Sequence, residues 1–376
     1  MPMDQNSSID TTPAKTNKPA AKKVSPVIGL FISFFTLALC LGGLELIAYR
    51  WEIKTAQGHL GWTLVAARRL SMERHGTSAS PYYLMKPGRS YNWEGIPVTI
   101  NARGLRGPDF TIPKPTGTTR ILNLGDSIAF GWEVPYEDTY GVKLAHLLQD
   151  SGWDIEVINA GVPAWNLESE RNFLQQEGLA YQPDLVILDI TLVNDIYGAG
   201  PSISEKQTVT QWLRDHTYFW PFLTIQARFL LSRQRGPEAI PVLNPPTEAE
   251  AYFPTRPESP VWDEFWAEID KMATACQAQD VPFIIIVFPT AFQLNSANHS
   301  RVPQEVLAEH AANAGLPLID LLPVYEQVCA QAERGACEGY ENLLFADVWM
   351  HPNTLGHRLA AETLLPEVHA ALDRLP

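Results

Sequence analysis

The chain has 376 residues, of which 45% are hydrophobic and 19% are charged. This composition is typical of a globular protein with a hydrophobic core, and it excludes a chain that is disordered throughout. The formal net charge of -14 argues against nucleic acid as a partner, because the phosphate backbone attracts clustered lysine and arginine. The sequence holds no such cluster beyond its N-terminal tail.

The N-terminal part of the chain contains a polar tail followed by a long apolar segment. Residues 1–26 are rich in Pro, Ser, Thr and Lys, which predicts a disordered tail. The segment from Val27 to Ala48 is apolar, and its one formal charge, Glu45, lies near its end. About 22 helical residues span roughly 33 Å, the thickness of a hydrocarbon core. We therefore predict a transmembrane helix over residues 27–49, in contact with the lipid bilayer.

The lysines before the apolar segment set its expected orientation. By the positive-inside rule they keep the N-terminus in the cytoplasm and export the rest of the chain to the periplasmic or extracellular side. A cleaved signal peptide is the alternative, but the segment is longer than a signal core and no small-x-small cleavage motif follows it. A buried core helix is a further alternative, which the apolar residues on every face of the segment disfavour.

Residues 50–117 contain many turn-forming residues and few long periodic runs. The stretches 81–88 and 101–108 are the richest in glycine, proline and asparagine. We predict an irregular lead-in that packs on the main domain.

From residue 118 onwards, short apolar strands alternate with segments of helical periodicity. Strands are predicted over 120–124, 155–158, 184–190, 283–288 and 318–320, and helices over 140–148, 167–179, 260–276 and 355–375. This alternation predicts a three-layer αβα sandwich around a mainly parallel five-stranded sheet. We assign the domain to residues 118–376, with an aromatic and Pro-rich insert over 198–258 that either packs beneath a long loop, touches the membrane or binds an acceptor.

Polar residues and a glycine follow three of the predicted strands. Gly125-Asp126-Ser127 follows the first strand, Asn159-Ala160-Gly161 the second and Asn194-Asp195 the third. Ligands of such sheets bind beyond the carboxyl ends of the strands. Taken singly, Ser127 is explained as a helix cap, Gly161 as a turn glycine and Asn194 as an Asx turn. Their occurrence at one edge indicates a reactive site instead.

A histidine reaches the same predicted edge from the last segment of the chain. Residues 347–353 read Asp-Val-Trp-Met-His-Pro-Asn and precede the C-terminal helix. His351 can take the proton of Ser127 and return it to a leaving group, while a nearby acid holds the imidazole. His357 is the alternative base, but it lies inside the predicted helix. We predict the nucleophile Ser127 and the base His351 of an acyl-transfer site.

With these motifs the chain resembles the SGNH hydrolases, also called GDSL lipases and esterases. The resemblance covers about residues 118–370, and residues 101–107 are similar to the preface of bacterial membrane-anchored members. It implies the flavodoxin-like SGNH fold. It also implies an oxyanion hole formed by the N–H groups of Ser127 and Gly161 and the side chain of Asn194, with His351 as base and Asp347 as its orienting acid.

Besides Ile128, where the family often has Leu, two positions depart from the family pattern. The third block of the family is usually Gly-x-Asn-Asp, whereas residues 192–195 read Leu-Val-Asn-Asp. The family usually has its aspartate three residues before the histidine, where this chain has Val348, and Asp347 stands four residues before His351. Either a local bulge lets Asp347 reach His351, or a backbone carbonyl orients the imidazole.

The sequence supports three hypotheses for function. The first is a serine esterase outside the cytoplasmic membrane, which removes acyl groups from glycans or small esters through an acyl-enzyme on Ser127. The second is an O-acyltransferase that passes the acyl group to an extracellular polysaccharide, as several relatives do. The third is a non-catalytic glycan-binding or scaffold module on a degenerate fold. A single anchor helix offers no evident route for a cytoplasmic acyl donor, which favours hydrolysis.

The four cysteines indicate no metal centre, because no C-x-x-C pair occurs. We expect neither a metal ion nor another cofactor. Cys329 and Cys337 either form a disulfide, which an exported domain permits, or are two separate core residues. The sequence favours neither alternative.

Overall fold

The computed structural model describes residues 25–56, 72–93, 96–197, 256–295, 300–337, 342–347 and 350–375, together with Val209, Trp212, Leu213, Thr217, Phe219, Trp220 and Leu223. The predicted tail over residues 1–26 and the predicted insert over 198–258 lie almost wholly outside these described residues. Both stay predictions.

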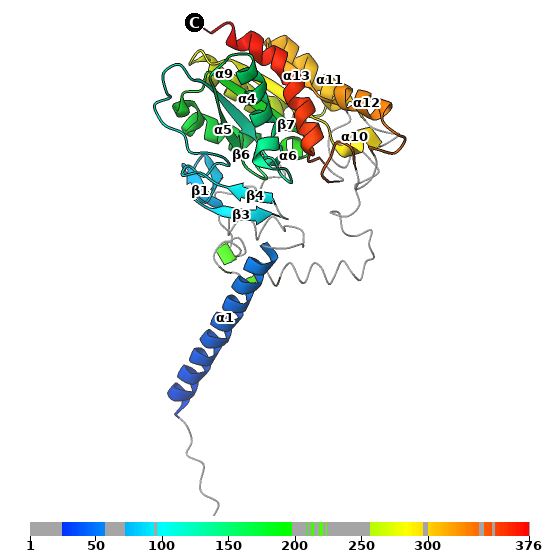
Figure 1. Ribbon diagram of the computed structural model, residues 1–376. Coiled ribbons are helices and arrows are strands. Elements are labelled where there is room, and N and C mark those ends of the chain that lie inside the picture. The colour runs from blue at the N-terminus through cyan, green and yellow to red at the C-terminus, as the bar shows by residue number, and fades with distance from the viewer. Residues whose placement is uncertain are drawn as a thin grey trace, which may run out of the picture.

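A long helix, α1 (Pro26–Ala56), projects from the rest of the molecule at its N-terminal end (Figure 1). Residues Leu30–Arg50 have a mean hydropathy of 2.1, and this stretch is long and apolar enough to cross a membrane. The most apolar window of this helix is not buried by any other described part of the protein. Because its apolar side chains stay uncovered, α1 is not a core helix of the domain.

The lead-in contains two β-hairpins, so the prediction of an irregular segment is wrong here. Strands β1 (Met72–Gly76) and β2 (Pro81–Met85) pair antiparallel, as do β3 (Ser90–Trp93) and β4 (Ile96–Thr99). Residues 77–80 join β1 to β2. Gly76 has φ 78°, and a Cβ there would lie 2.5 Å from the backbone oxygen of Ser80. Gly76 therefore ends β1 in a conformation that permits the turn of the first hairpin.

Five parallel strands form the central sheet, in the order β6-β5-β7-β8-β9. They are β5 (Thr119–Gly125), β6 (Ile155–Gly161), β7 (Leu185–Thr191), β8 (Phe283–Phe288) and β9 (Leu318–Asp320). Every residue of β7 and β8 is buried, which explains why β8 is wholly apolar and β7 is apolar apart from Asp189 and Thr191. The predicted parallel five-stranded sheet is confirmed.

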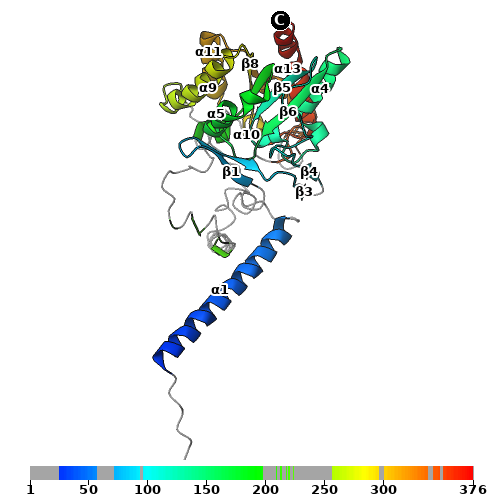
Figure 2. The same ribbon diagram turned by 90° about the vertical axis from the view of Figure 1, so that its left-hand side faces the viewer.

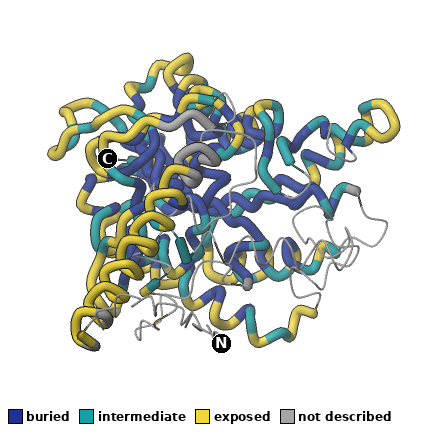
Figure 3. The backbone as a smooth tube through the Cα atoms, turned by 90° about the horizontal axis from the view of Figure 1, so that it is seen from below, coloured by how far each residue is buried: buried dark blue, intermediate teal, exposed yellow. Residues whose placement is uncertain are grey.

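Helices cover both faces of this sheet (Figure 2). One face carries α5 (Leu167–Gln176), α9 (Val261–Gln277) and α11 (Val302–Ala314), whose buried residues belong to one core cluster. The other face carries α4 (Tyr140–Asp150), α12 (Leu322–Gln331) and α13 (Thr354–Leu372), which belong to a second cluster. Figure 3 shows the strands buried between these layers, whereas α1 is exposed along most of its length.

A disulfide joins Cys329 at the end of α12 to Cys337, with 5.9 Å between their Cα atoms. It resolves the alternative that the sequence left open. Hydrogen bonds continue from this point, because the Asn342 side chain donates to the Cys337 carbonyl and the Leu343 N–H donates to the Ala336 carbonyl. The bridge thus anchors the segment that leads to His351.

Candidate active site

Ser127 lies at the carboxyl end of β5, as the first residue of the short helix α3 (Ser127–Phe130). Asp126 caps this helix, since its Oδ1 accepts the N–H of Ile128 at 2.8 Å. The Ser127 N–H has no acceptor within α3, because the first residues of a helix lack one. The Ser127 side chain is therefore presented at the strand end by a capped turn, and the residue is only 5% exposed.

The loop before α13 brings His351 to this serine. His351 Nε2 and Ser127 Oγ are 2.9 Å apart. On the other side of the ring, His351 Nδ1 lies 2.5 Å from Asp347 Oδ2. A carboxylate at Nδ1 requires a proton on that nitrogen, which leaves Nε2 free to accept the Ser127 hydroxyl proton. The three side chains form one continuous chain of hydrogen bonds.

Asp347 reaches the His351 ring across a spacing of four residues, and its other carboxylate oxygen binds the main chain at His351. Asp347 Oδ1 accepts the backbone N–H of Met350 at 2.9 Å and that of His351 at 3.1 Å. Of the two alternatives that the sequence allowed, the contact is therefore the one in which Asp347 itself reaches His351.

The charges around His351 favour its protonated form. Burial of the imidazole lowers its pKa, but the negative charges of Asp347, Asp126 and Glu133 outweigh burial, so the pKa of His351 is raised above its usual value. The ring of Trp132 is stacked on the imidazole, with 5.8 Å between the ring centroids and an angle of 29°. Both features stabilise the imidazolium that a general base forms.

Asn194 lies beside Ser127 on α6 (Leu192–Tyr197), which follows β7. Its side-chain amide donates to Asp126 Oδ2. Asp126 Oδ1 also accepts from the Thr191 hydroxyl at 3.0 Å. An amide nitrogen carries two hydrogens, so Asn194 keeps one for a further acceptor. The Asp126 carboxylate therefore holds Asn194 next to the serine turn.

Gly161 is placed at the same edge, but its N–H is already used. This N–H donates to Asn159 Oδ1 at 3.0 Å, and the Asn159 amide donates to the Ala129 carbonyl at 2.8 Å. A Cβ on Gly161 would lie 2.1 Å from the backbone nitrogen of Phe130. The structure therefore explains this glycine by close packing of β6 against α3, and its N–H is not among the free donors.

Ala164 has an unusual backbone conformation that its sequence did not indicate. It lies three residues beyond the end of β6 and has φ 64°, a left-handed conformation that is unfavourable for alanine. No hydrogen bond from its N–H to another described residue occurs. Backbone in this conformation often marks functional sites, but an alanine in a turn gives no signal in the sequence.

Asp189 packs against Gly125, two residues before Ser127, and was also not predicted from the sequence as a residue of the site. It lies in β7, where a Cβ on Gly125 would come within 1.9 Å of Asp189 Oδ1. The Tyr140 hydroxyl donates to Asp189 Oδ2 at 3.1 Å. Burial raises the pKa of Asp189 well above its usual value, and the charge of Asp126 adds to this effect. A charged residue within an otherwise apolar strand was the available signal.

His357 does not face the serine. It lies in α13, fully buried, and its Nδ1 accepts the backbone N–H of Tyr140 at 3.2 Å. Burial is the main reason that its pKa is lowered to about 3. His357 is thus a neutral acceptor at the start of α4, and His351 is the histidine that contacts Ser127. Among the described residues, no group of three His, Cys, Asp or Glu side chains is arranged to hold a metal ion.

Comparisons with known proteins were made in sequence and in structure. The model of the GDSL-like Lipase/Acylhydrolase family matches residues 124–359, which include Ser127 and His351. No curated protein matches the chain.

Solved structures with a similar arrangement include three bacterial proteins. A G-D-S-L family lipolytic protein from Veillonella parvula is 17% identical, with 68% of this chain and 100% of that chain covered and a TM-score of 0.39. A lipase/acylhydrolase from Enterococcus faecalis is 14% identical, with 67% and 96% covered and a TM-score of 0.40. A catalytic mutant of an acetylxylan esterase from Geobacillus stearothermophilus is 16% identical, with 66% and 94% covered and a TM-score of 0.40.

Proposed function

The chain belongs to the GDSL-like lipase/acylhydrolase family, and on this premise we propose that it is a serine esterase with Ser127 as nucleophile and His351 as general base. One observation carries the proposal. Ser127 Oγ lies 2.9 Å from His351 Nε2, while Asp347 lies 2.5 Å from the other ring nitrogen. These distances are within the reach that proton transfer to a base requires.

The reaction proceeds in two halves. Ser127 Oγ bonds to the ester carbonyl carbon while its proton moves to His351 Nε2. The tetrahedral intermediate expels the alcohol, which takes that proton, and an acyl-enzyme remains. Water then attacks the acyl carbon and passes a proton to His351, and the proton returns to Ser127 Oγ as the carboxylic acid leaves. Asp347 stabilises the imidazolium in both halves.

The oxyanion that forms in each half needs hydrogen-bond donors. We assign this role to the Ser127 N–H and to the second amide hydrogen of Asn194. The third donor is the Ala164 N–H in place of the predicted Gly161 N–H, which Asn159 already engages. Removal of one such donor costs about 3 kcal/mol of transition-state stabilisation in other hydrolases.

A structure with a phosphonate bound to Ser127 tests this oxyanion assignment. The phosphoryl oxygen is expected within hydrogen-bond distance of the Ala164 nitrogen. A phosphoryl oxygen bonded to the Gly161 nitrogen, with Ala164 remote, would contradict the assignment.

The expected substrates are acylated glycans or small esters outside the cytoplasmic membrane. The apolar helix α1 supports attachment to a membrane or export. The disulfide between Cys329 and Cys337 supports an oxidising compartment, because cytosolic thiols are kept reduced. In this setting water resolves the acyl-enzyme, so hydrolysis is the proposed outcome.

An acceptor experiment tests hydrolysis directly. The full chain in detergent is supplied with p-nitrophenyl acetate, with and without acetyl-free oligosaccharides, and the products are followed by mass spectrometry. We expect free acetate in equal amount in both cases, and no such release by Ser127→Ala. Acetylated sugar that depends on the acceptor would replace the esterase with an acyltransferase. Hydrolysis that Ser127→Ala retains in full would rule out both.

A further inference from the structure

A buried arginine of the lead-in extends beneath the end of α3. Arg106 is only 1% exposed. Its Nη1 donates to the carbonyl oxygens of Phe130 at 2.9 Å and Gly131 at 2.6 Å, and its Nη2 donates to that of Val134 at 2.9 Å. The guanidinium also lies over the Phe130 ring, 5.1 Å from its centroid. Arg106 thus holds both ends of the turn formed by residues 130–134.

These contacts demand an arginine in particular. The three hydrogen bonds of its Nη1 and Nη2 all go to main-chain carbonyl oxygens, whereas the buried Nε has no hydrogen-bond partner among the described residues. Burial lowers the pKa of Arg106 to about 10, and the group therefore stays charged at neutral pH. A planar fork of donors satisfies three carbonyl oxygens in one fixed geometry, which the single ammonium group of lysine does not reproduce.

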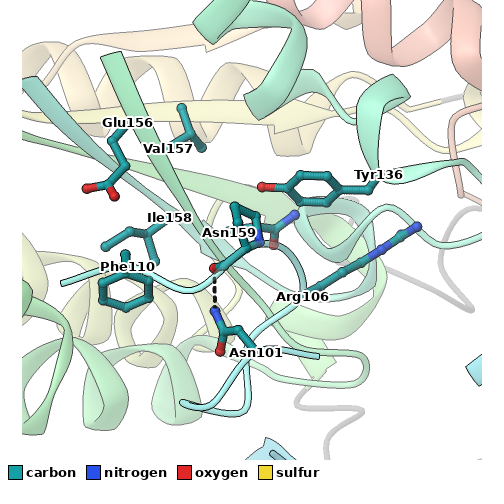
Figure 4. Close-up of a pocket in the computed structure, with 9 residues that line it drawn as sticks. Asn101, Arg106, Phe110, Tyr136, Glu156, Val157, Ile158 and Asn159 are labelled. Carbon is teal, nitrogen blue, oxygen red and sulfur yellow. Dashed lines mark hydrogen bonds between the residues drawn. The ribbon is translucent and has the colours of Figure 1, made fainter. Parts of the chain in front are cut away.

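The segment that presents Arg106 is itself fixed. Asn101 Oδ1 accepts the N–H groups of Arg103 and Leu105, and its amide donates to the Pro108 carbonyl at 3.1 Å. Figure 4 shows Asn101 and Arg106 along one small cavity, with Tyr136 on its far side. Arg106 therefore projects from a rigid loop of the lead-in.

The 130–134 turn links this arginine to the reactive residues. The Trp132 N–H donates to the Ser127 carbonyl at 2.9 Å, and the Trp132 ring is stacked on the His351 imidazole. The next residue, Glu133, has φ 61° and places a negative charge that acts on His351. A change in the conformation of this turn therefore moves both Trp132, whose ring contacts the His351 imidazole, and Glu133, whose negative charge raises the pKa of His351.

We propose that Arg106 is a positioning residue of the active site, which fixes the His351 imidazole through the 130–134 turn. The inference rests on the proposed function of Ser127 and His351. Under this proposal a residue of the lead-in contributes to the active site, although Arg106 lies outside the family match over residues 124–359.

The charges that face His351 determine what a loosened turn does. They are Asp347 on its own loop, Asp126 on the turn after β5, and Glu133 on the 130–134 turn. Movement of Glu133 and Trp132 away from the ring removes stabilisation of the imidazolium, so the pKa of His351 falls. The acidic limb of the kcat/KM profile then moves to lower pH, because the base is neutral at a lower pH.

Arg106→Lys keeps the charge but loses the fork, and Arg120→Lys is its matched control. Arg120 is also fully buried and donates to the carbonyl oxygens of Tyr181 and Thr111. Unlike Arg106 it also pairs with Glu156, and it lies near the amino end of β5, away from Ser127. The measurements are kcat, KM, the pH profile of kcat/KM and the melting temperature of each variant, with p-nitrophenyl acetate as substrate.

We expect both variants to melt at lower temperature, and only Arg106→Lys to change the chemistry. Its kcat falls about tenfold or more while KM stays within about threefold, as expected for a misplaced base, and its acidic limb moves to lower pH. Trp132→Leu removes the stack without a buried charge, so it reproduces the shift in pH profile even if Arg106→Lys fails to fold.

Three outcomes overturn the inference. In the first, folded Arg106→Lys has the kcat and pH profile of the wild type. In the second, Arg120→Lys shows the same loss and the same shift, which indicates a general effect of stability. In the third, Arg106→Lys does not fold and Trp132→Leu keeps the wild-type profile. Wild-type activity that survives in Ser127→Ala instead overturns the proposed function, and this result is separate from the other three.

Discussion

At the scale of single residues, the site depends on how main-chain hydrogen bonds set side-chain positions. Asp347 illustrates this, because its Oδ1 accepts two backbone N–H groups while its Oδ2 binds the imidazole. One carboxylate therefore closes the turn and orients His351 at the same time. A substitution that keeps the shape but removes the charge separates these two contributions.

We predict that Asp347→Asn lowers kcat by about 10²–10⁴-fold, because an amide donor at Nδ1 favours the wrong imidazole tautomer. Asp347 raises the pKa of His351, so its loss lowers that pKa, and the acidic limb of the kcat/KM profile moves to lower pH. Asp373→Asn is the control, since Asp373 pairs with His369 at the same spacing on the exposed side of α13. Wild-type kcat in Asp347→Asn would refute the orienting role.

The residues of the site differ in how far the sequence reveals them. Ser127, Asn194 and His351 lie in motifs whose spacing after predicted strands could be interpreted, and the structure brings Ser127 and His351 into contact. Arg106 and Ala164 could not be found in this way. The role of Arg106 depends on carbonyl groups some 25 residues away, and that of Ala164 on a backbone angle, neither of which the residue type encodes.

At the scale of elements, buried strands were the most predictable and weakly amphipathic helices the least. The strands β5 to β9 are rich in Ile, Leu and Val, and all five were predicted. Helices α11 and α12 were missed. The buried residues of α11 include Pro303 and Gln304, and those of α12 are only Leu322 and Tyr325, so neither shows a clear apolar stripe.

The helix pair α4 and α13 gives a pH-dependent prediction. His357 is neutral when folded, with a pKa of about 3, and it protonates near its usual value of 6.5 when unfolded. The unfolded state therefore binds more protons between these values, and stability is lost as pH falls from about 6.5 towards about 3, by about 1.4 kcal/mol per pH unit.

His357→Gln removes this titration but keeps an acceptor for the Tyr140 N–H. Urea unfolding of wild type and His357→Gln at several pH values is the measurement. The difference in unfolding free energy between the wild type and His357→Gln should decrease below pH 6.5 by about 1.4 kcal/mol per pH unit. Parallel curves for the two proteins would show that His357 does not titrate on unfolding.

The disulfide element gives a prediction that links stability to activity. Replacement of Cys329 and Cys337 by serine opens a loop with a sequence separation of 8 and should cost roughly 2–3 kcal/mol of unfolding free energy. Because the bridge anchors the segment leading to His351, kcat should fall as well. Cys40→Ser, on the exposed face of α1, should change neither quantity. A double variant with wild-type stability and kcat would contradict the anchoring role.

At the scale of the whole molecule, α1 and the domain are joined by the lead-in, and α1 projects away from the domain (Figure 1). Near the domain end of α1, Glu45 accepts the backbone N–H of Phe219 at 2.9 Å. This contact places one part of the predicted insert against the helix. An anchored chain would thus hold the domain and Phe219 on the same side of the bilayer.

We predict that the full chain stays in the membrane pellet after an alkaline carbonate wash, because α1 is long and apolar enough to cross a membrane and its apolar window is not buried in the protein. Added protease should digest the domain in spheroplasts and leave an N-terminal tag protected. Release of a soluble chain that begins after α1 would show instead that the segment is a cleaved signal sequence.

The most direct test of the whole account is covalent labelling by a fluorophosphonate, read as the modified peptide in mass spectrometry. An activated hydroxyl at position 127 predicts one label on Ser127 in the wild type, none in Ser127→Ala and a strongly reduced amount in His351→Ala. Ser151→Ala, which alters a serine at the end of α4, should be labelled like the wild type. A folded wild type that takes up no label, or a label that persists in Ser127→Ala, would contradict the account.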